Sequence, residues 1–327
     1  MDGRIKSGHD DYRLGRPVIP VLSIVLPVFG LIGLGVVGGK SRLFPEAAVV
    51  GLSNFVLYVA VPALLFRTIV RSRPFEALNL DIVYAYYAPS FVVLVGALLI
   101  GRFAFGLSGG ERASFAMGSM FSNTTLLGVP LVFATWGEAG LVPLMVVITL
   151  HSLLFATIFF VLHDMAKSGA VGWSSAARLA VHSIVTNPVI LSIAAGLAWA
   201  LSGWGLPSFI STMIDMLGDA TIPAALFALG ASLAQYKVAG NVQHALTMAV
   251  IKLVVHPLAV FVAANWLFDL TPLELAVITV TAALPGGLMV FLVAQTYGVY
   301  VARAGSSVVL STAGGVLTLS VLLSWLT

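Results

Sequence analysis

Val61-Pro62-Ala63-Leu64-Leu65-Phe66 returns later in the chain as Ile222-Pro223-Ala224-Ala225-Leu226-Phe227. Two further stretches also match each other: Ala134-Thr135-Trp136-Gly137 and Gln295-Thr296-Tyr297-Gly298. Each of them ends 75 residues after the proline of its own half. Each of these later stretches closes an apolar segment that glycine and proline interrupt. Two halves of one chain with interrupted apolar segments at matching positions are typical of secondary transporters, whose binding site lies at the interruptions.

The composition indicates a polytopic membrane protein. Hydrophobic residues make up 59% of the 327 residues, and charged residues make up only 9%. A soluble domain of this length needs more charge to cover its surface. We therefore expect an all-α protein in which apolar helices of about 20 residues cross a lipid bilayer.

Ten apolar segments are long enough to be membrane helices, at residues 18–39, 46–69, 82–101, 113–135, 141–163, 185–203, 209–234, 245–268, 273–296 and 303–326. The longest polar connection, residues 163–182, separates two groups of five segments. Because five is odd, the second group enters the membrane inverted relative to the first. We predict a polar tail at 1–17, a first repeat at 18–163, a connecting loop at 164–184 and an inverted second repeat at 185–327.

Several functional classes lack support in the sequence. The net charge is only +3 and the cations are spread over the loops, so we predict no nucleic-acid partner. The chain has no cysteine and no HExxH motif, so we predict no cofactor and no enzymatic activity. Residues 33–38 match a dinucleotide fingerprint, but they end an apolar segment, so these glycines indicate close helix packing.

The cations leave the orientation in the membrane nearly undecided. One predicted face carries seven Lys and Arg residues and the other carries eight, and such totals do not identify the cytoplasmic side. Every loop of the second face carries a cation, whereas the first face has none after Arg73, which favours external termini. The seven cations of the first face are Arg4, Lys6, Arg13, Arg16, Arg67, Arg71 and Arg73.

The fourth and ninth segments hold the candidate binding site. Proline and glycine interrupt both, and a broken helix persists in lipid only where it faces protein or a water-filled cavity. Two crossed broken helices would present partly positive helix ends to a bound anion. The alternative is a pair of simple kinks whose freed backbone groups are satisfied by Ser and Thr. The predicted substrate-binding residues are Asn123, Thr124, Thr125, Gly128, Pro130, Pro285, Gly286 and Gly287, with Asn54 and His151 from neighbouring segments.

Ionisable residues inside apolar segments are the candidates for charge or proton coupling. Lys252 lies deep in the eighth segment, where it needs a partner such as Asp81, Asp219 or an anionic substrate. His256 shares a helix face with Lys252, although a lone histidine there is more often a hydrogen-bonded core residue. The same holds for His151. Asp219 stands four residues before Pro223 and fits either the membrane interior or its interface.

These residues resemble a known family, the auxin efflux carriers. The stretch 123–131, followed by Gly137-Glu138-Ala139-Gly140, resembles the family's fourth-helix signature. Residues 61–66, Asn187-Pro188 and residues 283–287 fit the same pattern in order. The resemblance covers nearly the whole chain from about residue 20. It points to the bacterial branch, whose members look like carriers of small organic acids and are often labelled malonate transporters; the plant PIN proteins carry auxin.

The resemblance implies a fold similar to bile-acid and sodium/proton transporters. It implies ten helices, crossed broken helices 4 and 9, and external termini in the plasma (inner) membrane. Helices 1, 2, 6 and 7 would form a scaffold, with a homodimer formed through it, and helices 3–5 and 8–10 a mobile transport domain. Plant members pair a lysine of helix 8 with an aspartate of helix 3, which correspond here to Lys252 and Asp81. Thr124, Thr125 and residues 286–288 differ from the plant residues, which argues against auxin as the substrate.

We therefore expect a secondary transporter of a small organic anion, a mono- or dicarboxylate, that works by elevator-type alternating access. Asn123 and Thr124 would contact the carboxylate, Lys252 would balance its charge, and Asp81, Asp219 and His256 are the available proton carriers. A cation/proton antiporter of similar fold is one alternative, although the breaks carry amides and hydroxyls where such proteins place a carboxylate. A membrane-embedded sensor that binds ligand without turnover is the other.

Overall fold

The computed structural model describes residues 21–327 except 42, 72–78, 169–172 and 237. All regular elements in this part of the chain are helices, and a single isolated β-bridge joins Ser122 to Gly286. The predicted polar tail at 1–17 lies outside the described residues. The prediction of an all-α protein is confirmed for the described chain.

The helices of the first half are interrupted by short π-helical turns. They are α1 (Val21–Lys40), α2 (Glu46–Phe55), η1 (Val56–Ala60), α3 (Val61–Arg71), α4 (Leu80–Phe103), α5 (Gly109–Met120), η2 (Thr124–Gly128), α6 (Val129–His151), η3 (Ser152–Ala156) and α7 (Thr157–Ser168). The elements α2, η1 and α3 form one continuous helix.

The second half follows with α8 (Trp173–Thr186), α9 (Pro188–Ser202), α10 (Ser208–Asp219), α11 (Thr221–Leu233), α12 (Val242–Val250), η4 (Ile251–Val255), α13 (His256–Leu267), α14 (Pro272–Ala283), α15 (Met289–Tyr297) and α16 (Val301–Leu326). The prediction of a connecting loop at 164–184 was wrong, because the end of α7 and most of α8 lie within these residues. Apolar residues at helical spacing in 176–185 are enough to form a helix, although they are too few for a membrane span.

Six helical stretches of the described chain are long and apolar enough to cross a membrane. They are Glu46–Arg71, Leu80–Phe103, Thr124–Lys167, Ser208–Leu233, Val242–Leu267 and Val301–Leu326. Shorter apolar helices cover Val25–Lys40, Pro188–Ser202 and Pro272–Ala283. These helices agree with a multi-pass membrane protein, whereas the inverted repeat of ten segments stays a prediction.

The repeated stretches of sequence occupy similar places in the fold. Pro62 lies inside the continuous helix 46–71, directly after the π-helical turn η1, and Pro223 lies near the start of α11 within the stretch 208–233. Gly137 and Gly298 share positive φ angles, 64° and 65°, whereas their ψ angles are −151° and 21°. A positive φ angle strongly favours glycine, which both positions carry. Gly137 bends α6, and the stretch Thr124–Lys167 is therefore not one straight helix.

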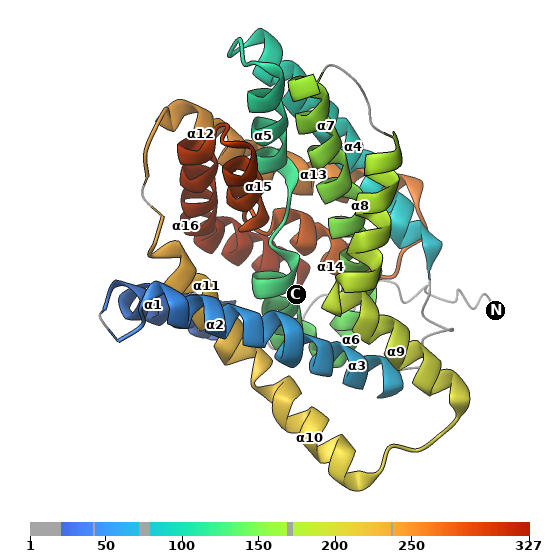
Figure 1. Ribbon diagram of the computed structural model, residues 1–327. Helices are drawn as coiled ribbons and strands as arrows, with labels where there is room; N and C mark the ends of the chain where they lie inside the picture. The colour runs from blue at the N-terminus through green and yellow to red at the C-terminus, as the bar shows by residue number, and fades with distance from the viewer. Residues whose placement is uncertain (1–20, 42, 72–78, 169–172, 237) are drawn as a thin grey trace, which may run out of the picture.

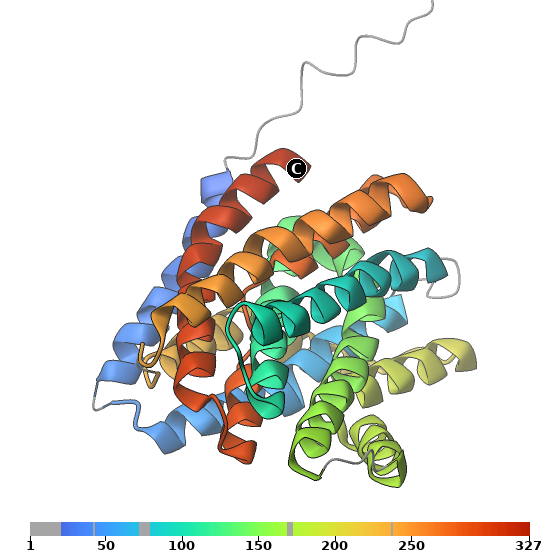
Figure 2. The same cartoon turned by 90° about the horizontal axis from the view of Figure 1, so that it is seen from above.

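The helices pack in two groups (Figure 1). In the first group, α1 and α2 pack on α11, and α9 and α10 pack on α3. The second group contains α4–α7 and α12–α16, in which α4 runs beside both α5 and α13 (Figure 2). The element α6 also contacts α3, α9 and α11, so it lies where the two groups meet.

Glycines make the closest contact of the first group. A Cβ added at Gly35 of α1 would lie 2.2 Å from the Phe227 carbonyl oxygen, and one at Gly230 of α11 would lie 1.9 Å from the Ile32 carbonyl oxygen. The interpretation of this glycine run as a helix-packing surface is confirmed at Gly35, Gly38 and Gly39, whereas Gly33 has no such neighbour within 4 Å.

Candidate functional site

The two predicted breaks meet in the middle of the second group. The first separates α5 from η2 at residues 121–123, and the second separates α14 from α15 at residues 284–288. The Asn123 N–H donates to the Pro285 carbonyl over 2.9 Å, and the Gly287 N–H donates to the Phe121 carbonyl over 3.1 Å. Each break therefore satisfies backbone groups that the other exposes, as a non-helical segment in lipid requires.

Side chains complete the backbone pairing at the crossing. The Gly286 N–H donates to Ser311 Oγ of α16 over 3.0 Å. The Ser122 N–H donates to His151 Nε2 over 3.2 Å, and His151 is fully buried. His151, predicted as a substrate ligand, thus supports the first break from behind. Ser311 escaped the sequence analysis because a lone serine in an apolar helix carries no positional signal.

A cavity of about 640 Å³ opens beside the crossing, between the two groups of helices. The first group contributes residues of α2 and the end of α11, and the second contributes the first break and α15. Five predicted residues line it: Asn54, Asn123, Thr124, Thr125 and Gly287. Polar side chains that the prediction omitted from the site are Glu46, Ser53, Ser122, Ser232, Gln235, Tyr236 and Gln295.

Asn123 is the side chain of this wall with an unused donor. It is 6% exposed and lines the cavity, and its Nδ2 has no hydrogen-bond partner among the described residues. A buried donor without a partner costs free energy, so such a group in a cavity wall is suited to bind a ligand acceptor. Glu46 is the one charged residue among those that line the described cavity.

Four predicted residues lie behind this wall. Gly128 allows the breaks to approach, since a Cβ there would lie 2.8 Å from Leu284 Cδ1. Pro130 is buried two residues after the π-helical turn η2, within the helical stretch that begins at Thr124. Pro285 and Gly286 offer their backbone to Asn123 and Ser311. Gly128, Pro285 and Gly286 therefore shape the crossing of the breaks.

Lys252 is fully buried in η4 and supports the second break. Its Nζ donates to the carbonyl of Ala282, near the end of α14, and lies 3.3 Å from His256 Nδ1. The other ring nitrogen of His256 lies 2.8 Å from Ser90 Oγ of α4. The partners of Lys252 are thus a carbonyl and an imidazole, and no described carboxylate forms an ion pair with it.

The two predicted aspartate partners lie elsewhere. Asp81 is in the first turn of α4, nine residues and about 13 Å along the helix from Ser90. Asp219 forms an ion pair with Arg67, with Oδ1 2.9 Å from NH1. Tyr86, which the sequence analysis missed, lies between His256 and the first break, with its hydroxyl 3.5 Å from Ser122 Oγ and its ring 5.8 Å from that of His256.

Comparison with known families decides the class of this protein. A model described as membrane transport protein matches residues 20–323, which is nearly the whole chain. The chain belongs to this membrane transport family. It is 28% identical over 308 residues to a protein of Rhizobium meliloti named "Putative malonate transporter", covering 93% of this chain and 95% of that one. It is 24% identical to auxin efflux carrier component 8 of Arabidopsis thaliana, covering 86% of this chain and 90% of the relative.

Membership of the membrane transport family confirms the resemblance seen in the sequence. The matches to both a bacterial and a plant protein extend over most of each chain, as expected for a bacterial-type member of the auxin efflux carrier family. The protein is therefore a membrane transporter and not an enzyme.

Proposed function

We propose that this chain is a secondary transporter of a small organic anion, bound in the cavity beside the crossed breaks. The unpaired Nδ2 of the buried Asn123 is the observation that carries the proposal, because it offers a donor to a carboxylate oxygen. The names of the relatives agree, since malonate and auxin are both carboxylates. A monocarboxylate and a dicarboxylate are both included in the proposal.

Neutral donors would hold the anion. Asn123, Thr124, Thr125 and Gln295 bring amides and hydroxyls to one cavity, and the described lining contains no Lys or Arg. Lys252 and His256 lie behind the breaks and do not line the cavity. They would therefore act on the substrate at a distance, through the electrostatic field of a charge that they carry. Asp81 and Asp219 have no part in this proposal, because neither lies beside Lys252.

The architecture that we propose is an inverted repeat of ten membrane segments. The continuous helix 46–71 corresponds to α10 with α11, α4 corresponds to α12–α13, and the two breaks correspond to each other. The matching prolines and positive-φ glycines support this assignment.

The cavity supports an elevator mechanism, because residues of both helix groups line it. Asn54 and Ser232 come from the first group, which we assign as the scaffold, and Asn123 and Thr124 come from the second. Movement of the second group along the first would carry the crossing and its ligand across the membrane. A homodimer through the scaffold helices belongs to the same proposal.

We also propose external termini in the plasma (inner) membrane. Arg67 was counted as a loop cation, but it is buried within α3. Without Arg67, the face that carries the N-terminal tail has six cations against eight on the other face. The larger number marks the cytoplasmic side.

The test is a thermal-shift screen of the purified protein against mono- and dicarboxylic acids. We expect one acid to raise the melting temperature of the parent protein and of the control Asn265→Ala, which removes an exposed amide on α13. At the same concentration, this acid should stabilise Asn123→Ala much less than it stabilises the parent protein. Stabilisation of Asn123→Ala to the same extent would contradict the proposed site.

Counterflow of the labelled acid in proteoliposomes then separates the functional classes. Exchange of labelled for unlabelled acid across the membrane is expected of a carrier. An acid that stabilises the protein but shows no counterflow would indicate a sensor. Stabilisation by sodium or pH alone, without a response to any acid, would favour a cation/proton antiporter.

A further inference from the structure

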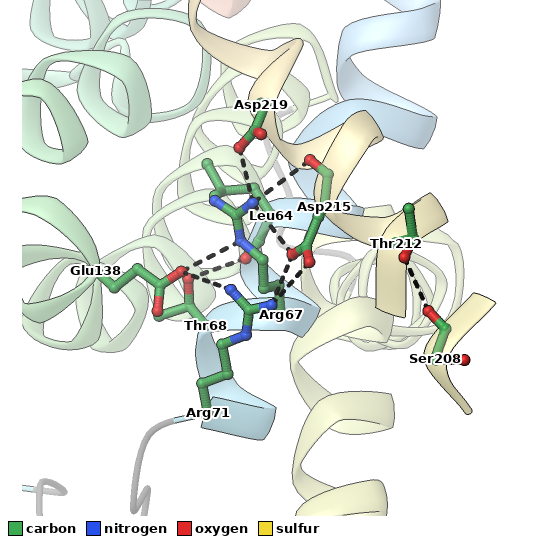
Figure 3. Close-up of polar contacts among 9 residues, drawn as sticks. All are labelled: Leu64, Arg67, Thr68, Arg71, Glu138, Ser208, Thr212, Asp215 and Asp219. Atoms are coloured by element: carbon green, nitrogen blue, oxygen red, sulfur yellow. Dashed lines mark hydrogen bonds and ion pairs between the residues drawn. The ribbon is translucent and has the colours of Figure 1, made fainter. Parts of the chain in front are cut away.

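Five charged residues form a cluster far from the proposed site (Figure 3). We name it the latch cluster: Arg67 and Arg71 of α3, Glu138 of α6, and Asp215 and Asp219 of α10. Arg67 is its centre, with Nε 3.2 Å from Glu138 Oε1 and NH1 2.9 Å from Asp219 Oδ1. Arg71 NH2 binds both oxygens of Asp215, at 2.8 and 2.9 Å.

The latch cluster joins the two helix groups. Four of its members belong to the first group, whereas Glu138 belongs to the second and directly follows the bend at Gly137. The Arg67 side chain is only 6% exposed, so its charge depends on these carboxylates. Phe133 of α6 lies under the same guanidinium, 5.9 Å from it. The second group therefore contacts a buried cation of the first at this point.

The latch cluster and the cavity lie at opposite ends of the same helices. In the continuous helix 46–71, the cavity is lined by residues between Glu46 and Leu57, and the latch cluster uses Arg67 and Arg71. In 208–233 the order is reversed, with Asp215 in the latch cluster and Ser232 in the cavity. A helix of 26 residues is about 39 Å long. The first group thus contacts the second through charges at one end and leaves space at the other.

Comparison of the repeated positions shows that the two ends of the first group carry different kinds of side chain. At the offset of 161 residues that separates Pro62 from Pro223, Asp215 corresponds to Asn54 and Arg71 corresponds to Ser232. Both counterparts line the cavity. Arg67 and Glu138 correspond to Ala228 and Val299. The positions that hold the groups together at one end are uncharged at the open end.

We propose that the latch cluster is a gate of the transport cycle, which closes one side of the carrier while the cavity is open to the other. Glu138 must leave Arg67 and Arg71 each time the second group moves. The Glu138 side chain is 35% exposed and that of Arg71 is 47% exposed, so water can solvate both charges as the gate opens. This inference rests on the proposed two-body movement, but its test needs no substrate.

The chain has no cysteine, so single cysteine reporters need no background changes. Val50→Cys reports on the cavity, which Val50 lines with 51% of its side chain exposed. Thr68→Cys reports on the latch cluster, because Thr68 follows Arg67 and is 1% exposed. The rate of reaction with a water-soluble maleimide is measured for both reporters in nanodiscs, where both faces are accessible.

The test variant is Glu138→Gln, and the matched control is Glu111→Gln. Glu111 forms an ion pair with Arg303 at the same 3.2 Å, and its side chain is 32% exposed, but α5 and α16 both lie in the second group. A glutamine at 111 can keep the capping box at the start of α5. Glu138→Asp keeps the charge, and the melting temperature of every variant verifies that it is folded.

We expect Glu138→Gln to raise the labelling rate of Thr68→Cys about tenfold, or about 1.4 kcal/mol, because it removes one of the carboxylates paired with the buried Arg67. The charge reversal Glu138→Lys should raise it further and at least halve the labelling of Val50→Cys. Glu111→Gln should change neither rate. Added salt should speed Thr68→Cys labelling only where Glu138 is retained.

Unchanged labelling of Thr68→Cys in Glu138→Gln and Glu138→Lys would overturn the gate. Faster labelling there, with Val50→Cys unaffected by Glu138→Lys, would show local loosening and would overturn it as well. If the labelling behaves as expected but no acid shows counterflow, the gate stands and the proposed transport function fails.

Discussion

The two helix breaks meet at one crossing, but they contribute different parts of the site. The first break places Ser122, Asn123 and Thr124 at the cavity, so it contributes polar side chains. The second reads Leu284-Pro285-Gly286-Gly287, and it contributes backbone groups that pair with the first break and with Ser311. In the proposed site, the first break would therefore bind the ligand through side chains, and the second break would support it through its backbone.

The difference has a steric origin. A Cβ at Gly287 would lie 3.3 Å from the Phe121 ring and 3.4 Å from the Ser122 carbonyl oxygen. The second break must stay small there for the two backbones to pair. The first break meets open space on its cavity side and can carry larger polar side chains. Substitutions of residues in the first break should therefore change the affinity for the ligand. Substitutions of residues that support the second break should change the stability of the protein.

The largest effect is expected from Lys252→Ala, which removes the donor to the Ala282 carbonyl beside the second break. The substitution leaves a buried carbonyl unpaired and a cavity in place of a fully buried side chain. We expect the free energy of unfolding to fall by roughly 3 kcal/mol, together with loss of transport. The melting temperature should drop in Lys252→Ala and not in Lys167→Ala, which removes an exposed lysine of α7. Equal melting temperatures would show that Lys252 does not support the break.

Asn123→Ala tests whether the side chains of the first break bind the ligand. Because Nδ2 has no partner among the described residues, its loss should leave the melting temperature of the empty protein nearly unchanged. The affinity for the carboxylate should fall about 10- to 100-fold, the effect of one hydrogen bond to a charged group. Titration of ligand in the thermal-shift assay measures both quantities. A lower melting temperature with unchanged affinity would reverse the roles of the two breaks.

Ser311→Ala should have the opposite profile. It removes the acceptor of the Gly286 N–H, 3.0 Å away, and leaves that buried donor unpaired. We expect a loss of about 1–2 kcal/mol in stability and no change in the order of preference among acids. Ser324→Ala is the control, since its hydroxyl donates to a carbonyl within its own helix and is exposed. A changed order of acids would mean that the second break also selects the ligand.

Gly128→Ala and Gly286→Ala should have the smallest effects and test how closely the breaks approach. The new Cβ would meet Leu284 Cδ1 at 2.8 Å, a side-chain end that can shift. The strain is partly offset by the better helix propensity of alanine, so we expect a loss of about 1 kcal/mol. At Gly286 the nearest atom would be Ser311 Oγ at 3.4 Å, an ordinary contact, so Gly286→Ala should be milder. Melting curves of the two variants settle the order.

Local sequence signals predicted which segments break and part of the site. Proline and glycine act on the backbone of their own segment, so the second break, at 284–288, could be found at Pro285 without the fold. The first break lies at 121–123, five to nine residues before the Gly128 and Pro130 from which it was predicted. Five of the ten predicted substrate-binding residues line the cavity, all near a break or on α2. Ser311 and Tyr86 could not be found, because their roles depend on contacts with distant segments.

By itself, the sequence determined the membrane class and the two segments whose helices break, because apolar composition, glycine and proline act locally. The tertiary structure alone decided which charges are paired. Lys252 has Ala282 and His256 as partners, and Arg67, counted as a loop cation, is buried against residues 71 to 152 positions away in the chain. Partners so far apart in sequence become neighbours only when helices from both halves pack, since a buried charge is stable only beside the groups that packing brings to it.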